Sequence, residues 1–90
     1  MGGGIVSILQ KAIEIVNSNR AKEYGNYRQN WQRTALIASL LIGKPLSAKD
    51  CALIMMAVKL ARESYKHKED NLVDLCGYAE ILNRLHEDKP

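Results

Sequence analysis

Two stretches of this sequence are apolar on nearly every side of the helix that each would form. Residues 36–42 read LIASLLI, and residues 51–61 read CALIMMAVKLA, with Lys59 as the single charged residue. A helix that is apolar all round must be covered on all sides. The stretch at 51–61 is therefore expected to be the central helix of the fold or to face another subunit.

Helical spacing and helix-stop residues divide the chain into four predicted helices. Gly43 and Pro45 end the second helix, and Ser47 with Asp50 forms a capping-box pattern that starts the third. The helices are expected at about residues 4–24, 27–42, 48–61 and 70–86. Because no strand pattern occurs and the connections are short, the sequence predicts an all-α fold, a small four-helix antiparallel bundle.

The length of the chain limits how well such a bundle can be buried. Its 90 residues make at most one domain, which we expect to span residues 1–90 with frayed ends at 1–3 and 87–90. A chain of this size buries only about 60–65% of its unfolded surface, so its stability margin is thin. The two apolar stretches also offer more surface than the neighbouring helices of one small bundle can cover. We therefore expect a homo-oligomer, at least a dimer.

Several classes of protein are disfavoured by the residue pattern. No apolar run reaches the roughly 18 residues of a membrane span, and the start of the chain lacks the basic region of a signal peptide. Cys51 and Cys76 lack the spacing of a zinc site and are interpreted as reduced core thiols. We expect a cytoplasmic protein with no cofactor, no metal and no membrane partner.

Positive charge is concentrated in two segments, which indicates an anionic partner. Residues 20–33 and residues 59–68 each carry four Lys or Arg residues against one Glu. In the first segment Arg20 and Tyr24 lie one helical turn apart, where a guanidinium could pair with a phosphate and a phenol ring could stack on a base. The alternative is that Arg20 neutralises a helix C-terminus while Tyr24 packs.

Two further groups of candidate residues come from the second half of the chain. Lys59, three residues before Arg62, must reach water, pair with a carboxylate or meet a ligand, because it is the lone charge in an apolar run. His67, Asp70 and Asp74 could bind a metal, hold basic residues or cap a helix. We expect Asp74 to face Lys59 or Arg62 across the hairpin of the third and fourth helices.

Two residues of the second predicted helix complete the candidate set. Asn30 offers an amide that could read the polar edge of a ligand, and Trp31 is interpreted as a core or interface anchor, with stacking on a base as the alternative. No catalytic residue is assigned. The candidate ligand-binding residues are Arg20, Tyr24, Asn30, Trp31, Lys59, Arg62, His67, Asp70 and Asp74.

These groups together resemble an uncharacterised family of short helical proteins from phages and prophages. The pattern reads R-x-x-x-Y-G, an Asn five residues later, G-x-x-L-[ST]-x-x-D, M-x-x-x-K-x-x-R and H-x-x-D-x-x-x-D-x-x-G-Y-A. The matching residues are Arg20, Tyr24, Gly25, Asn30, Gly43, Leu46, Ser47, Asp50, Met55, Lys59, Arg62, His67, Asp70, Asp74, Gly77, Tyr78 and Ala79. The family usually has a proline shortly after Tyr-Gly, where this chain has Tyr27. The resemblance implies a phage origin and a helical fold.

Three hypotheses about function remain open at this point. The first is a binding protein that sequesters a phosphorylated, cyclic nucleotide immune signal without cleaving it, by analogy with small oligomeric phage proteins that do so. The second is a metal-dependent nucleotide pyrophosphohydrolase of the MazG-like kind, although this sequence contains none of the E-x-x-E and E-x-x-D pairs that those enzymes need. The third is a binder of nucleic acid or of a host protein, for which no helix-turn-helix signature is present.

Overall fold

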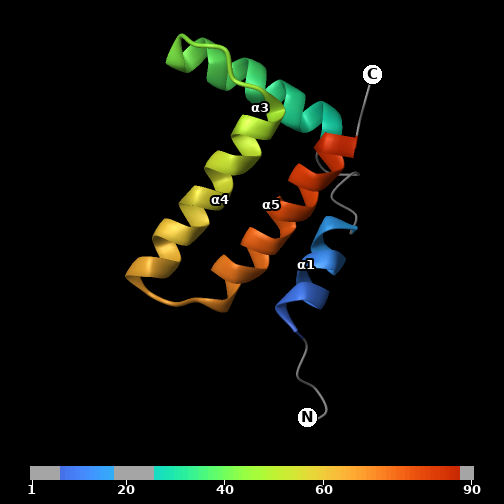
Figure 1. The fold of residues 1–90 in the computed structure, drawn as a ribbon, viewed down its shortest axis with the longest axis vertical. Helices are drawn as coiled ribbons and strands as arrows, with labels where there is room; N and C mark the ends of the chain where they lie inside the picture. Colours follow the sequence, from blue (N-terminus) through green and yellow to red (C-terminus); the bar gives the residue numbers. More distant parts are fainter. Residues whose placement is uncertain (1–6, 18–25, 88–90) are drawn as a thin grey trace.

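The computed structural model describes residues 7–17 and 26–87, and all the regular structure in these two ranges is helical. The predicted all-α class is therefore confirmed for the described part of the chain. The helices, labelled as in Figure 1, are α1 at Ile8–Val16, α3 at Tyr27–Ile42, α4 at Ala48–Tyr65 and α5 at Glu69–Glu87.

The predicted helix boundaries agree with the structure where the sequence has clear helix-start and helix-stop residues. Helix α3 has the bounds expected from the sequence, whereas α4 continues to Tyr65, beyond the end of the apolar run. The described helix α1 ends at Val16 and is capped by Asn17, and the predicted continuation through residues 18–24 lies outside the described residues. The same holds for the frayed ends expected at 1–3 and 88–90, whereas Glu87 belongs to α5.

Local side-chain chemistry explains where α3 and α4 begin. The side chain of Asn26 accepts a hydrogen bond from the backbone N–H of Arg28 at 2.8 Å, which satisfies a free donor at the start of α3. At the start of α4 the Asp50 N–H donates to Ser47 Oγ at 3.0 Å, and the Ser47 N–H donates to Asp50 Oδ2 at 2.9 Å. The capping box predicted from the sequence is thus confirmed.

The turn between α3 and α4 is held by Gly43 and Ser39. Gly43 adopts a φ of 80°, the left-handed conformation in which a residue without Cβ is least strained. Ser39 Oγ donates to the carbonyl of Ala35 at 2.7 Å and accepts from the N–H of Leu46 at 2.8 Å. These hydrogen bonds hold Leu46, which lies just before α4, against α3. They therefore fix the direction in which α4 begins.

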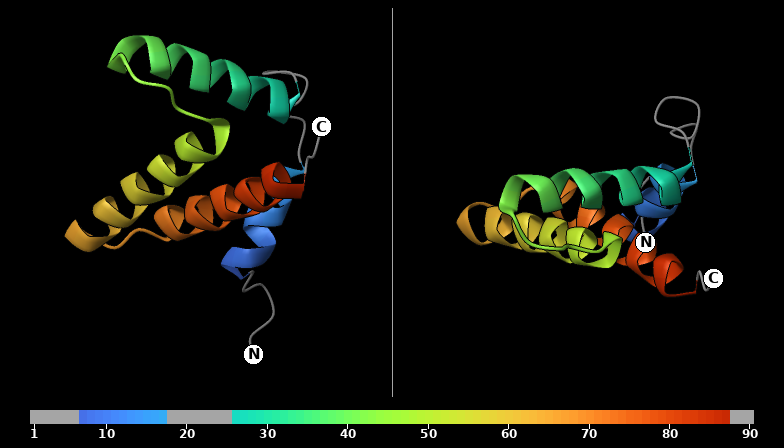
Figure 2. Two further views of the ribbon diagram at one scale, coloured as in Figure 1. Left: turned by 45° about the horizontal axis from the view of Figure 1, so that its top comes forward. Right: turned by 90° about the horizontal axis from the view of Figure 1, so that it is seen from above.

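The helices are arranged as a hairpin with one helix beside it and one across its end (Figure 1). Helices α4 and α5 lie side by side and share the most extensive contact, α1 packs against α5, and α3 contacts α4 less extensively. Figure 2 shows the C-terminal halves of α3 and α4 standing apart, with the segment that joins the two helices running back along α3. The radius of gyration is 14.5 Å, larger than the about 12 Å typical of a 90-residue domain.

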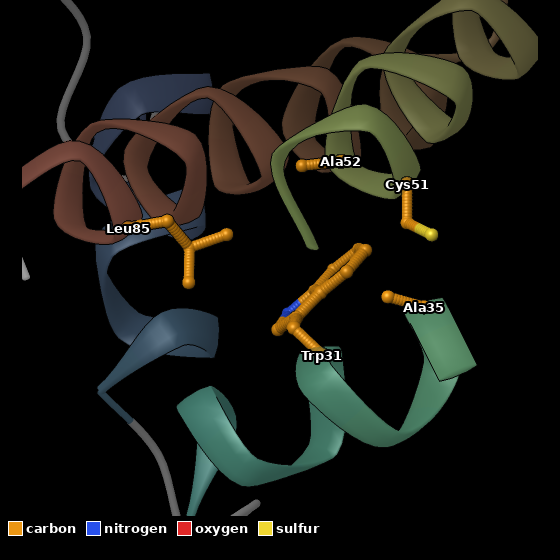
Figure 3. Close-up of a cluster of buried hydrophobic side chains, with 5 residues drawn as sticks. All are labelled: Trp31, Ala35, Cys51, Ala52 and Leu85. Atoms are coloured by element: carbon orange, nitrogen blue, oxygen red, sulfur yellow. The ribbon is translucent and has the colours of Figure 1, made fainter. Parts of the chain in front are cut away.

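The main hydrophobic core lies where α3 crosses the hairpin (Figure 3). Trp31 of α3 is buried, and its ring meets the ring of Tyr78 of α5 edge to face, with 5.9 Å between centroids and an interplanar angle of 87°. Ala52 is fully buried, so α4 can approach the indole closely. The buried members of this cluster are Trp31, Ala35, Cys51, Ala52 and Leu85.

Helix α4 is not covered on all sides within one chain. Leu53, Ile54 and Leu60 are each about half exposed, and on α3 Leu40 and Leu41 are 76% and 83% exposed. Of the two expectations for the apolar run at 51–61, a fully covered central helix is therefore not found among the residues that the structure describes. The other expectation, a face turned toward another subunit, stays a prediction and is taken up below.

Replacing Ser47 with alanine is expected to lower the free energy of unfolding by about 1 kcal/mol, because α4 loses its N-cap. Urea denaturation followed by circular dichroism, at one fixed protein concentration, measures this loss. Ser64→Ala is the matched control, since Ser64 Oγ only donates to the Ala61 carbonyl near the far end of α4. Equal stability losses in the two variants would contradict the role given to the capping box.

Candidate functional site

The structure spreads the candidate residues along the molecule and does not gather them at one point. Arg20 and Tyr24 lie outside the described residues. Asn30 and Trp31 belong to α3, Lys59 and Arg62 to α4, and His67 to the turn that follows it. Asp70 and Asp74 lie on α5, one turn apart. Each therefore has to be considered in its own surroundings.

Lys59 and Asp74 pair with each other inside the α4–α5 hairpin. The Lys59 Nζ atom lies 2.8 Å from Asp74 Oδ2, and the two side chains are only 11% and 23% exposed. The expectation that Asp74 faces Lys59 or Arg62 is confirmed for Lys59. Because each charge has its counter-charge, neither residue needs a ligand to account for its burial.

Glu63 organises the turn between α4 and α5, together with His67. One carboxylate oxygen of Glu63 accepts from the Lys68 N–H at 3.0 Å and from Asn71 Nδ2 at 3.2 Å, and the other contacts His67 Nδ1. The hydrogen bond with His67, then those with Lys68 and Asn71, hold the pKa of Glu63 below its ordinary value of 4.5. His67, in the turn, thus has a structural partner four residues earlier, near the end of α4.

Trp31 and Asn30 lie at the other end of the hairpin. The Trp31 indole is packed in the core, as the anchor interpretation expects, and its ring faces Tyr78. Asn30 is half-buried, and its backbone carbonyl accepts a hydrogen bond from Thr34 Oγ1 at 2.9 Å. The contacts of Trp31 explain its position without a nucleotide base.

Arg84 is a linking residue that the sequence did not single out. Its Nε atom lies 2.8 Å from Glu80 Oε2, and its Nη2 atom donates to Asn17 Oδ1 at 2.9 Å. Its guanidinium also lies over the ring of Tyr27, 5.8 Å from the centroid. Arg84 therefore joins the end of α1 and the start of α3 to α5. No sequence signal indicates this role, because the partners are distant along the chain.

An open groove runs between α1 and the beginning of α5. Its lining includes Glu14, Glu69 and Asp70, with Lys11 as its single cation, and Lys11 pairs with Glu69. The apolar part of the lining is Ile15 and Val73. Because carboxylates predominate, this groove repels an anionic ligand, and Asp70 is not placed where a phosphate would be held.

Most carboxylates of the described helices are engaged by the fold, whereas many cations are not. Asp74, Glu63, Glu69 and Glu80 each have a cationic or imidazole partner, and Asp50 caps α4. Within the described residues no three His, Cys, Asp or Glu side chains form a group that could hold a metal ion. The Lys and Arg side chains without an ion pair in that same part are Arg33, Lys44, Lys49, Arg62, Lys66 and Lys68.

The described residues thus form a small helical fold in which more cations than carboxylates are left without an ion pair. Residues 7–86 match the family described as Domain of unknown function (DUF6378), and the chain belongs to that family. The resemblance to a phage family is supported by two similar proteins, both of which come from phages. None of the described helices is long and apolar enough to cross a membrane.

Two similar proteins come from mycobacteriophages. The chain is 34% identical over 83 residues to the Gene 55 protein of Mycobacterium phage D29, a match that covers 91% of this chain and 55% of that protein. It is 36% identical over 83 residues to the Gene 55 protein of Mycobacterium phage L5, covering 89% and 53% respectively. The chain thus spans about half the length of these curated relatives. No solved structure matches the chain.

Replacing Asp74 with alanine is expected to destabilise the protein by about 2 kcal/mol, because the largely buried Lys59 ammonium loses its counter-charge. Urea unfolding at neutral pH measures the change. Glu69→Ala is the control, since it breaks the more exposed pair with Lys11 and should cost less than about 1 kcal/mol. A loss for Asp74→Ala no greater than that for Glu69→Ala would contradict the structural role of the buried pair.

The lowered pKa of Glu63 predicts an acid-sensitive turn between α4 and α5. Glu63 stabilises the fold fully above its ordinary value of 4.5, and this contribution is lost as the pH falls through the lower folded-state pKa. Glu63→Gln should therefore be less stable than the wild type at pH 7, with a much smaller difference at pH 3. Ser64→Ala, which removes no carboxylate, serves as the control. A Glu63→Gln deficit that is equally large at pH 3 would contradict the assignment.

Proposed function

We propose that this domain is a non-enzymatic binding domain that holds a phosphorylated nucleotide, cyclic in form, and sequesters it unchanged. The observation that carries the proposal is the set of exposed cations left without carboxylate partners. Arg62 lies in the last turn of α4, Lys66 is the C-cap residue that follows this helix, and both are exposed. Cations that are close in sequence at a helix end can hold the oxygens of one phosphate or of two adjacent phosphates.

The surrounding fold supports placing the anion at this end of α4. Glu63, the nearest carboxylate on the same helix, is occupied by His67, the Lys68 N–H and Asn71. It forms no ion pair with Arg62. Lys68, also exposed, adds a third cation to the turn. An arginine fork binds phosphate oxygens in pairs, which makes Arg62 the residue that we expect to contribute most.

The rest of the proposed site comes from residues outside the described structure and from a second chain. Arg20 and Tyr24 are the sequence-based candidates for a further phosphate contact and for stacking on a base. The proposal includes the oligomeric four-helix bundle expected from the sequence, because a ligand with two or more phosphates fits a site lined by two copies. The phage relatives support action in the cytoplasm of an infected bacterium.

Isothermal titration calorimetry against a panel of cyclic and linear nucleotides tests this function. At least one member is expected to bind with a Kd below about 100 μM, and Arg62→Ala should weaken that binding about tenfold or more. Lys44→Ala is the control, because it removes an exposed cation at the opposite end of α4. The bound nucleotide should be recovered unchanged after the protein is denatured.

Three outcomes would contradict the proposal. Absence of binding to every nucleotide of the panel at about 100 μM would rule out the ligand class. Conversion of a nucleotide to products in the presence of Mg²⁺ or Mn²⁺ would show a hydrolase instead of a protein that sequesters its ligand. Equal weakening by Lys44→Ala and Arg62→Ala would show that only overall charge matters and that the end of α4 is not the site.

A further inference from the structure

Large aliphatic side chains are exposed on the outer sides of both α3 and α4. On α3 the exposed side chains recur one turn apart in two adjacent rows, Leu36 with Leu40 and Ile37 with Leu41. No charged residue occurs between Arg33 and Lys44. We call these four residues of α3, together with three exposed aliphatic residues of α4, the α3–α4 outer face. Its members are Leu36, Ile37, Leu40, Leu41, Leu53, Ile54 and Leu60.

This amount of exposed aliphatic surface on two successive helices is unusual for a monomer. Seven large aliphatic side chains, each about half exposed or more, present on the order of 700 Å² of surface. Monomeric proteins rarely leave more than about 300–600 Å² in one apolar patch. One partner of a stable protein complex contributes about 800 Å², so the face has nearly the size that a dimer needs.

We propose that a second copy of this chain covers the α3–α4 outer face. The inference rests on the self-association included in the proposed function, but it does not depend on the nucleotide. The members of this face are all uncharged, so they do not favour an oppositely charged partner. An identical copy presents the same aliphatic side chains over an equal area. A two-fold axis lets one apolar patch cover itself, which is the commonest way in which small proteins pair.

The arrangement of the helices leaves the C-terminal half of α3 accessible to this second copy. Helix α3 crosses the hairpin through Trp31 and Ala35, and its C-terminal half then lies apart from α4, so this half has few neighbours among the described residues (Figure 2). The partner's α3 and α4 would pack against the half of α3 that lies beyond Ala35. Four helices, two from each chain, would then surround a common core, and both apolar stretches of the sequence would be covered as their composition requires.

Light scattering coupled to size-exclusion chromatography tests the inference on the full chain. The wild type should have twice the 10.1 kDa of one chain, or a higher multiple. Leu40→Glu and Leu41→Glu should each shift the mass to 10.1 kDa with unchanged helical circular dichroism, because both side chains are already exposed in the monomer. Leu60→Glu should do the same through α4. Ile13→Glu, an equally drastic change at an exposed position of α1, is the control and should keep the wild-type mass.

The possible failures can be told apart. A wild-type mass of 10.1 kDa at every micromolar concentration overturns both this inference and the self-association in the proposed function, while calorimetry still decides the ligand. An oligomer that survives Leu40→Glu and Leu41→Glu, or one that Ile13→Glu also dissociates, overturns the assignment to this face. A wild-type monomer that sediments with lipid vesicles would show that a membrane surface, and not a second copy, is the occupant.

Discussion

The rest of the structure depends on the contact between α4 and α5, inside which the largely buried Lys59 and Asp74 neutralise each other. Lys59 and Asp74 pair within this hairpin, and Glu63 closes its turn through Lys68 and Asn71. Trp31 then fixes α3 across the opposite end by its contact with Tyr78. Because the hairpin and the Trp31 cluster use only the inner sides of α3 and α4, the aliphatic outer sides of both helices remain exposed.

The same internal pairing shapes the electrostatic character of the domain. Glu63, Glu69, Asp74 and Glu80 are engaged in contacts of the fold, so the cations without partners dominate the far end of α4. The groove between α1 and α5 has the opposite character, since carboxylates predominate in its lining. We place the proposed anion site at the end of α4 for this reason, and not in the groove.

The sequence predicts the parts of this structure that depend on neighbouring residues. Gly43 and Ser47 mark helix ends through backbone geometry and capping, which are local, and the lone charge of Lys59 in an apolar run required a partner. The roles of Glu63 and Arg84 could not be predicted in this way. Each is an ordinary helical charge whose partners are set by packing, and Arg84 reaches Asn17, 67 positions away in sequence. For the same reason the sequence could not decide whether Trp31 packs or stacks on a ligand.

The central claim is that one chain covers too little of α3 and α4, and that another copy covers the remainder. Amide hydrogen exchange tests this claim most directly, because it reports the burial and stability of each helix in solution. The amides of residues 38–42, in the half of α3 that diverges from the hairpin, are predicted to be protected as strongly as those of α4. They should lose this protection when the protein is diluted. Rapid exchange of these amides at every protein concentration would contradict the account.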